Sequence, residues 1–212
     1  MTASLAAHRQ PQRTAAGRAE GRAVTSPAPR PLAPSPLPAA APLQLVPRPE
    51  GLLQVHTAPF RGSVAAVFSQ ALRSAGLGSR VLVSQFLKGG VDQGRAGSLQ
   101  LCGRLEWLRP ATPLCIQEPL ATARDPEEAA AAQQAVLEVW HYSCERLLDG
   151  SVDLLVLDEL GLAVELGYLA GPEVSAALQQ RPAHLDVILT GPSMPAELMA
   201  MADQVTQLRR CA

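Results

Sequence analysis

The chain has 212 residues and a formal net charge of −1; 47% of its residues are apolar, 3% aromatic and 17% charged. Four cysteines are too few for a disulfide scaffold, and no run of about 18 apolar residues lacks charges, so we expect neither such a scaffold nor a membrane span. A net charge near zero gives no reason to expect a nucleic-acid-binding protein. The length suits one domain with a tail, or two very small domains.

The N-terminal segment differs in composition from the rest. Ten of the 19 prolines lie in the first 50 residues, with six arginines and two glutamates, so this segment carries +4 and leaves −5 for the other 162 residues. It contains no Phe, Tyr or Trp, and prolines remove backbone donors. We therefore predict a disordered, Pro/Ala/Arg-rich arm over residues 1–49 and a folded domain over 50–212. We expect a cytoplasmic protein, although the Arg-rich, acid-poor arm leaves organelle targeting open.

From residue 51 onward, short apolar runs alternate with helical patterns. The runs expected as strands are 52–56, 80–86, 104–109, 152–159, 185–191 and, as a possible edge strand, 204–209. Helices are expected over 64–75, 126–148, 172–180 and 195–201, and residues 88–103 are expected to form a loop. This alternation predicts a three-layer α/β domain with a mostly parallel sheet of five or six strands.

The helix expected over 126–148 has the clearest start signal. Asp125 can cap it, and Pro126 fits the first turn, where its missing N–H has no helical partner. The apolar stripe expected on this helix consists of Val136, Trp140, Cys144 and Leu147 or Leu148.

The loop after the first strand has the position of a phosphate-binding loop. Such a loop needs glycines, a lysine for the outer phosphates and a hydroxyl for Mg²⁺. Here Gly62 is the only glycine that remains, Ser63 has the lysine position and Val64 the hydroxyl position. The pattern by itself therefore leaves an ordinary strand-to-helix turn as an alternative to a nucleotide site.

Two acids, Asp158 and Glu159, end the apolar run at 152–159. In nucleotide-binding α/β proteins an acid at this place reaches Mg²⁺ or its water shell, and oxygen ligands suit that cation. Acids at strand ends also simply begin loops or cap helices, so both roles remain open here.

The order and spacing of several short motifs resemble the corrinoid adenosyltransferases of cobalamin biosynthesis (CobA/BtuR type). The resemblance covers about residues 51–210. It rests on the opening strand with its His-Thr turn (52–57), Gln85-Phe86-Leu87-Lys88-Gly89, Leu157-Asp158-Glu159-Leu160 with Gly167-Tyr168-Leu169, and the C-terminal third from 178 to 206.

This resemblance implies a P-loop (RecA-like) fold that binds ATP, Mg²⁺ and a corrinoid, and it suggests a homodimer. It implies transfer of the 5′-deoxyadenosyl group from ATP to a cob(I) corrinoid, with triphosphate as the leaving group. By position, Asp158 and Glu159 would face the magnesium ion, and no residue is assigned a catalytic role. The residues that would bind the nucleotide or corrinoid are Thr57, Arg61, Gly62, Ser63, Lys88, Thr190 and Gly191.

The departures from the family pattern lie where triphosphate chemistry is expected. Arg61 stands where the family has the first lysine of its loop, Phe60 replaces a glycine, and Thr-Gly-Pro at 190–192 replaces Thr-Gly-Arg. The aromatic stretch that contacts the corrinoid in the family is not visible between residues 109 and 125.

From these departures we predict weak or absent adenosyltransferase activity. One alternative is a still active enzyme that uses Arg61, Lys88 and backbone donors. The other is a non-catalytic protein that binds a corrinoid or a partner.

Overall fold

The computed structural model describes residues 50–209 apart from residues 63 and 91–92. The predicted arm over residues 1–49 and the predicted site residue Ser63 therefore lie outside the described residues. The strands are β1 (Leu53–Thr57), β2 (Val81–Gln85), β3 (Leu99–Leu101), β4 (Leu105–Leu108), β5 (Leu154–Asp158), β6 (Asp186–Gly191) and β7 (Gln204–Gln207). The helices are α1 (Ala65–Gly76), α2 (Pro126–Leu148), α3 (Leu160–Glu165), α4 (Gly171–Gln179), α5 (Ala196–Met201) and a short 3-10 helix (Leu120–Thr122).

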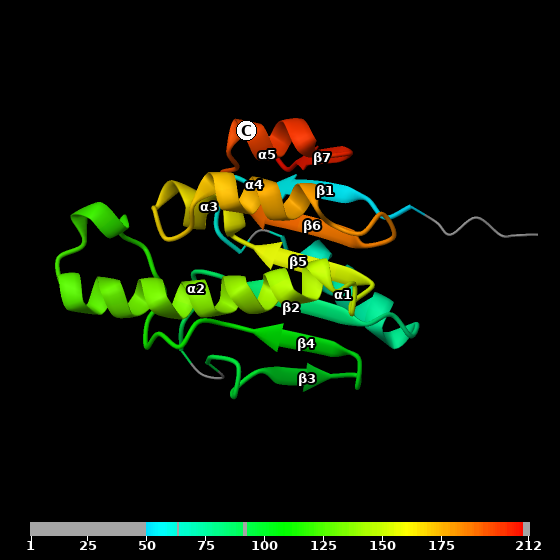
Figure 1. Cartoon of the computed structure of the whole chain (residues 1–212), viewed down its shortest axis with the longest axis horizontal. Helices are drawn as coiled ribbons and strands as arrows, with labels where there is room; N and C mark the ends of the chain where they lie inside the picture. The colour runs from blue at the N-terminus through cyan, green and yellow to red at the C-terminus, as the bar shows by residue number, and fades with distance from the viewer. Residues whose placement is uncertain (1–49, 63, 91–92, 210–212) are drawn as a thin grey trace, which may run out of the picture. The chain divides into compact units, whose positions relative to one another are not determined.

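The strands form one sheet in the order β3-β4-β2-β5-β6-β1-β7. Every neighbouring pair is parallel except β3 and β4, and Figure 1 shows the β3 arrow opposed to those of β1, β4 and β5. The register pairs Gln85 with Asp158, Asp158 with Thr190, and Thr57 with Gly191. The carboxyl ends of β1, β2, β5 and β6 therefore meet at one edge of the sheet.

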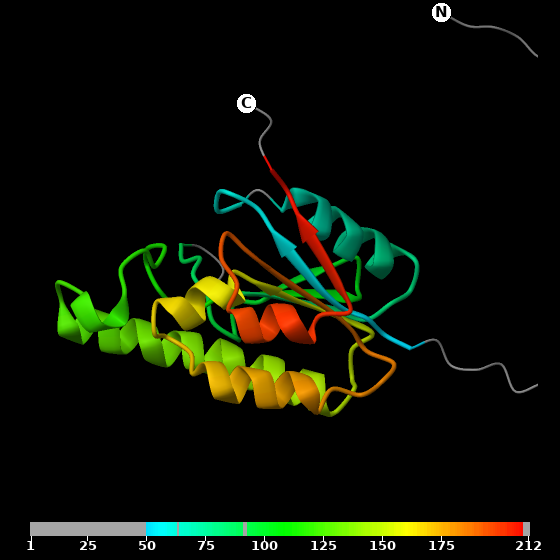
Figure 2. The same ribbon diagram turned by 90° about the horizontal axis from the view of Figure 1, so that it is seen from above.

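Helices cover both faces of the sheet, as the α/β pattern predicts. Helix α1 lies on one face, and α2, α3, α4 and α5 lie on the other (Figure 2). Strand β5 contributes side chains to the cores on both faces of the sheet, because successive side chains of a strand point to opposite faces. Leu155 and Leu157 pack in the core on the α2 side, whereas Leu154 and Val156 pack in the core on the α1 side.

The start and the apolar stripe of α2 agree with the sequence prediction. The side chain of Asp125 accepts hydrogen bonds from the backbone N–H groups of Glu127 (2.9 Å) and Glu128 (3.1 Å), as an N-cap does. The stripe is buried at Val136, Trp140 and Leu147, with Cys144 partly buried against the same core, whereas Leu148 is exposed. No helix in the described ranges has the length and hydropathy that a membrane span needs.

Two predictions about the sheet and its connections are wrong. The sheet has seven strands rather than five or six. Residues 88–103, expected as a loop, contain β3, which joins β4 through a tight turn at Cys102 (φ 53°) and Gly103 (φ 67°). A three-residue edge strand with exposed side chains carries too little pattern to be identified. Helix α3 was also not expected, because it follows β5 after only one residue, Glu159.

Candidate nucleotide and corrinoid site

The fold brings the predicted site residues to one edge of the sheet. Thr57, Asp158, Thr190 and Gly191 end β1, β5 and β6. Arg61 and Gly62 lie in the loop between β1 and α1, Lys88 follows β2, and Glu159 lies between β5 and α3. Ser63 belongs to the same loop but is outside the described residues. The order of the strands therefore brings these residues to one edge, whereas their role in binding a nucleotide or a corrinoid stays a prediction.

Arg61 does not extend into the loop but turns toward the end of β5. Its Nε donates to Glu159 Oε1 at 2.8 Å and its Nη2 donates to Glu159 Oε2 at 2.6 Å. Such two-pronged guanidinium–carboxylate pairs are the strong class of charge-assisted hydrogen bonds. The side chain of Glu159 is 2% exposed and that of Arg61 is 30% exposed, so the pair is shielded on the carboxylate side. Both charges are therefore neutralised within the protein.

The same guanidinium also ties down two other loops. Nη1 donates to the carbonyl of Ile116 at 2.8 Å, and Nη2 donates to the carbonyl of Leu87 at 3.3 Å. With the two bonds to Glu159, four of the five N–H groups of Arg61 have protein acceptors. Hydrogen bonding to Glu159 raises the pKa of Arg61 above its usual value. At most one donor of Arg61 is left for a ligand.

Glu159 is placed for this contact by an unusual backbone conformation. Its φ is +62°, in the left-handed region that residues other than glycine seldom adopt. This conformation costs roughly 1–2 kcal/mol, which the surrounding contacts offset. Gly191 approaches the same point closely, because a Cβ atom there would lie 3.5 Å from the Cα of Glu159 and 3.2 Å from the carbonyl oxygen of Ser193. The ends of β5 and β6 are therefore closely packed.

Asp158, the other acid expected to face magnesium, is held in a buried network of hydrogen bonds. Gln85 Nε2 donates to its Oδ2 at 2.7 Å, and Thr190 Oγ1 donates to its Oδ1 at 2.5 Å. Gln85 Oε1 in turn accepts from Trp107 Nε1 (2.8 Å) and Arg109 Nε (2.9 Å). Burial raises the pKa of Asp158, against the two hydrogen bonds that favour the carboxylate. Both of its oxygens thus already have protein donors.

Lys88 is the cation that remains beside the loop. A Cβ atom built on Gly62, whose φ is +78°, would lie 3.9 Å from Lys88 Nζ, so the ammonium group stands next to the loop backbone. The charge of Lys88 also acts to lower the pKa of Asp158. Within the described residues, no hydrogen bond or ion pair is recorded for its Nζ. Among the described residues around this loop, Lys88 therefore has the side chain with the most free donor capacity toward an anion.

The N-cap side chain of α1 offers no donor to a phosphate and no ligand to a magnesium ion. Val64 occupies the N-cap position, is 4% exposed, and provides no side-chain hydrogen bond to the helix. Its side chain packs in the core with Ala58 on the α1 side of the sheet. The hydroxyl position of the loop is thus filled by a core residue.

A pocket of about 720 Å³ adjoins these loops. It lies between residues 111–118, the first half of α2 and Tyr168. Ile116 belongs to its lining and also accepts the hydrogen bond from Arg61, so the pocket and the Arg61–Glu159 pair share a wall. Thr112 Oγ1 is buried in this wall and has no hydrogen-bond partner among the described residues. Sequence reasoning missed this pocket, because residues 110–118 carry no pattern of their own.

The fold defines the class of this protein, an α/β domain with a mostly parallel seven-stranded sheet and its candidate site at the carboxyl edge of that sheet. The model of the family described as "ATP:corrinoid adenosyltransferase BtuR/CobO/CobP" matches residues 49–212. The chain therefore belongs to the corrinoid adenosyltransferase family, as its motifs predicted. Among the described residues, no group of three or more His, Cys, Asp or Glu side chains is arranged to hold a metal ion.

Three curated relatives illustrate the similarity. The corrinoid adenosyltransferase of Escherichia coli (strain K12) is 33% identical over 159 residues, which are 75% of this chain and 76% of the relative. Corrinoid adenosyltransferase CobA of Salmonella typhimurium (strain LT2) has the same identity and coverage. The corrinoid adenosyltransferase of Pseudomonas aeruginosa (strain PAO1) is 31% identical over 158 residues, 74% of each chain.

Proposed function

We propose that this member of the corrinoid adenosyltransferase family transfers the adenosyl group of ATP to a cob(I) corrinoid weakly or not at all. The observation that carries the proposal is the pair between Arg61 and Glu159, because it consumes the loop's own cation and one of the two predicted magnesium ligands. The phosphate loop is in this sense degenerate.

The described residues do not fit a magnesium–triphosphate group well. Arg61 has at most one free donor, the hydroxyl position is Val64, and the oxygens of Asp158 and Glu159 already accept hydrogen bonds from protein side chains. Lys88 and the backbone N–H groups of the loop are the donors that remain for an anion. The magnesium roles of Asp158 and Glu159 remain predictions.

The size of the expected loss follows from the interactions that are missing. Each charge-assisted hydrogen bond contributes roughly 1.5–3 kcal/mol. Loss of the loop lysine, the magnesium hydroxyl and the later arginine of the family pattern would remove about 4–8 kcal/mol, although such contributions are not additive. This corresponds to a loss of about a thousandfold or more in triphosphate affinity.

The direct test follows the conversion of cob(I)alamin to adenosylcobalamin by the full-length protein. The E. coli relative at equal concentration is the reference. We expect a rate at least about a thousandfold below the reference at subsaturating ATP. Turnover comparable to the reference would overturn the proposal.

The role of Lys88 is tested in the same assay with Lys88→Gln. Because Lys88 is the cation left beside the loop, we expect any residual activity to fall further in this variant. Arg73→Gln is the matched control. Arg73 is exposed in the last turn of α1, so this substitution removes an equal charge away from the site.

A second candidate function is corrinoid binding without transfer. The 720 Å³ pocket favours it, because this pocket lies beside the loop edge yet is formed by residues other than those of the phosphate loop. Under this proposal hydroxocobalamin raises the melting temperature of the protein, whereas ATP with Mg²⁺ does not.

Filling the pocket tests this second function. Ala131 lines the pocket on α2, whereas its neighbour Ala130 is exposed and does not line it. We expect Ala131→Trp to abolish the corrinoid effect on the melting temperature and Ala130→Trp to preserve it. A corrinoid effect that survives Ala131→Trp, or is absent in the wild type, contradicts corrinoid binding in this pocket.

A further inference from the structure

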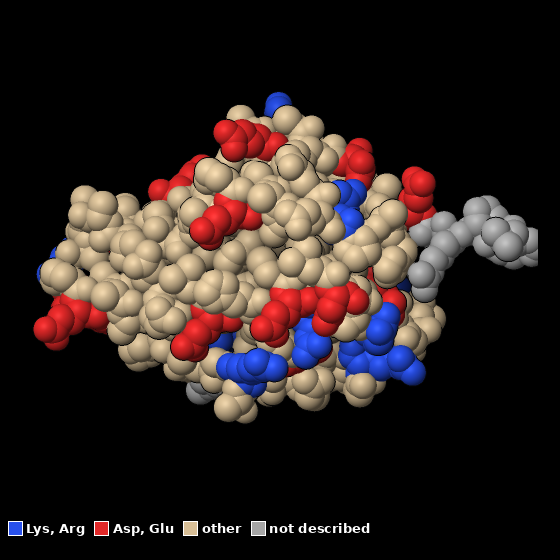
Figure 3. Space-filling view, viewed as in Figure 1, with Lys and Arg blue, Asp and Glu red and all other residues tan. Residues whose placement is uncertain are grey.

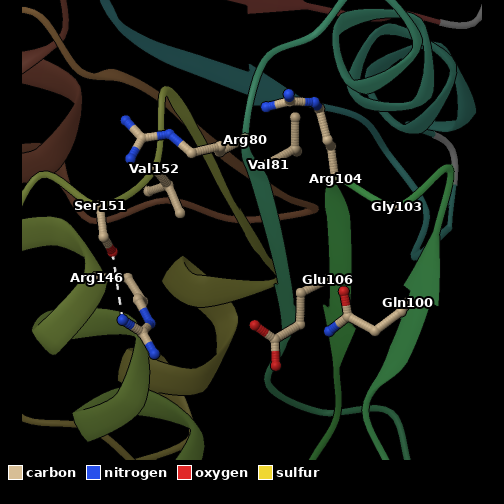
Figure 4. Close-up of a pocket in the computed structure, with 9 residues that line it drawn as sticks. All are labelled: Arg80, Val81, Gln100, Gly103, Arg104, Glu106, Arg146, Ser151 and Val152. Carbon is tan, nitrogen blue, oxygen red and sulfur yellow. Dashed lines mark hydrogen bonds between the residues drawn. The ribbon is translucent and has the colours of Figure 1, made fainter.

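A separate pocket of about 380 Å³ opens at the opposite edge of the sheet, where β2 and β4 begin. Its lining comes from the first residues of β2 and β4 and the segments before them, from the segment before β5, from β3 and from the last turn of α2 (Figure 4). The lining residues are Arg80, Val81, Gln100, Gly103, Arg104, Glu106, Arg146, Ser151 and Val152. None of them belongs to the site at the carboxyl edge.

Three arginines from distant parts of the sequence line this pocket. Arg80 precedes β2, Arg104 precedes β4, and Arg146 lies in the last turn of α2. Figure 3 shows Lys and Arg side chains gathered below α2, on the β3–β4 side of the molecule and next to a row of Asp and Glu side chains. This gathering occurs in a part of the chain, residues 51–212, whose formal charge is −5. Arg80 and Arg146 are paired with Asp153 and Asp149, so Arg104 is the arginine of this lining that is most available to an anion.

At one end of the pocket, guanidinium N–H groups have spare capacity. Arg80 is held by Asp153 through Nε (3.2 Å) and Nη2 (2.8 Å), which leaves its Nη1 without a recorded acceptor in the described part of the chain. The hydrogen bond from Arg80 lowers the pKa of Asp153 to about 2, so this pair stays ionised at neutral pH. For Arg104, no hydrogen bond or ion pair of the side chain is recorded among the described residues.

The backbone presents Arg104 firmly although its side chain is exposed. Its N–H donates to the carbonyl of Leu101 (3.2 Å) across the turn, and its carbonyl accepts from the N–H of Val81 (2.8 Å). Val81 and Val152 of the lining are buried, so the floor of the pocket is apolar on the protein side. An electrostatic contact above such a floor is less screened than one on an open surface.

The other end of the pocket is rich in acceptors. Glu106 accepts a hydrogen bond from the hydroxyl of Tyr142 (2.7 Å), and its other oxygen has no recorded donor among the described residues. Gln100 lies beside it in Figure 4. Arg146 stands near this end and balances the charge of Glu106, while its own bonds to Asp149, Ser151 and Tyr142 are long, at 3.3–3.4 Å. The pocket therefore has a cationic end and an acceptor end.

We propose that this pocket binds a phosphate monoester whose carbon part carries hydroxyl groups, such as a sugar phosphate. The phosphate, with a charge of about −1.5 to −2 at pH 7, accepts hydrogen bonds from the guanidinium of Arg104, and Arg80 adds a second positive charge to the same lining. The hydroxyl groups donate hydrogen bonds to Glu106 and Gln100. A second anionic group could not take this place, because the carboxylate of Glu106 would repel it. The site is independent of the nucleotide loop and of the proposed loss of adenosyl transfer.

The test is calorimetric titration of the full-length protein with ribose 5-phosphate, and with inorganic phosphate and ribose as separate ligands. We expect saturable binding of ribose 5-phosphate that weakens at least tenfold in Arg104→Gln, about the loss of one charge-assisted hydrogen bond. Arg73→Gln, an exposed arginine on α1, removes the same charge elsewhere and is expected to leave binding unchanged. Glu106→Gln is expected to weaken ribose 5-phosphate more than inorganic phosphate, since only the sugar contacts it.

Three results would overturn the proposal. One is the absence of saturable binding by ribose 5-phosphate. Another is equal binding by wild type and Arg104→Gln, with thermal melting confirming that both are folded. The third is binding that is lost in Lys88→Gln and kept in Arg104→Gln, because phosphate would then occupy the nucleotide loop instead.

Discussion

The guanidinium of Arg61 and the carboxylate of Glu159, 98 positions apart in the sequence, form two hydrogen bonds of 2.8 and 2.6 Å at the carboxyl edge of the sheet. Arg61 stands in the loop that would hold a triphosphate, and Glu159 stands where the family resemblance implies a magnesium ligand. The donors of Arg61 and the acceptors of Glu159 are thus used within the protein instead of by a ligand.

This pairing makes the effect of Glu159→Gln on nucleotide affinity diagnostic. If Glu159 mainly sequesters Arg61, the substitution frees a guanidinium for phosphate, and we expect ATP to bind about tenfold more tightly, measured by calorimetry. If Glu159 instead contributes to magnesium binding, the same substitution weakens Mg²⁺-dependent ATP binding. Glu173→Gln is the control, because Glu173 is exposed in the first turn of α4 and lies outside the lining of the 720 Å³ pocket.

Asp158 is expected to titrate above the usual range of an aspartate. Burial raises its pKa above the usual 3.8, which means that the folded state holds a proton more tightly than the unfolded chain. Its contribution to stability is therefore fully present below pH 3.8 and is lost as the pH rises through the raised pKa. Carboxyl-carbon NMR of Asp158 across pH 3–8 measures this directly, and a midpoint at or below 3.8 would contradict it.

Close packing at Gly161 gives a prediction about stability. A Cβ atom at Gly161 would lie 2.4 Å from the carbonyl oxygen of Ser193 and 2.8 Å from the Cα of Met194, so Gly161→Ala forces backbone to move and destabilises by roughly 1–3 kcal/mol. Gly76, in α1, is the matched control, because nothing lies within 4 Å of its Cβ position. We expect Gly76→Ala to be neutral or to stabilise by up to about 1 kcal/mol. Urea unfolding of the two variants distinguishes these outcomes; equal effects would contradict the packing argument.

The stability that the N-cap gives to α2 is expected to depend on the side-chain oxygen of Asp125. Asp125→Ala removes the acceptor for two backbone N–H groups and is expected to lower the free energy of unfolding by about 1 kcal/mol. Asp125→Asn keeps an oxygen acceptor and is expected to retain most of this contribution. If chemical denaturation gives both variants the same midpoint as wild type, the cap does not stabilise the helix.

The parts of the fold that the sequence predicts are those whose signals are local. Residues 126–148 form one helix with the expected bounds, because a cap, a proline and a repeating apolar stripe all fall within the segment. The apolar runs at 152–159 and 185–191 contain β5 and β6, whose side chains are almost all buried. By contrast, β3 has only three residues, mostly exposed, and α3 has six, so neither carries a period long enough to recognise.

The same distinction between local and long-range signals holds for the candidate site. That Thr57, Asp158 and Thr190 share one edge follows from the order of strands and the parallel sheet. That Arg61 contacts Glu159, and that Asp158 is held by Gln85, depends on the register of strands and on a left-handed residue at 159, which no local pattern reveals. The pockets belong to this second group, since their walls come from segments far apart in the chain.

The four bonds of Arg61 join the loop after β1 to the segments that follow β2, β4 and β5. Replacing Arg61 alone would leave Glu159 as a buried, unpaired carboxylate, which costs about 3–5 kcal/mol. A neutral residue at position 61 therefore requires a compensating change at position 159 to avoid this cost. Arg61 thus has a structural role in holding four segments together, in addition to any contact with a ligand.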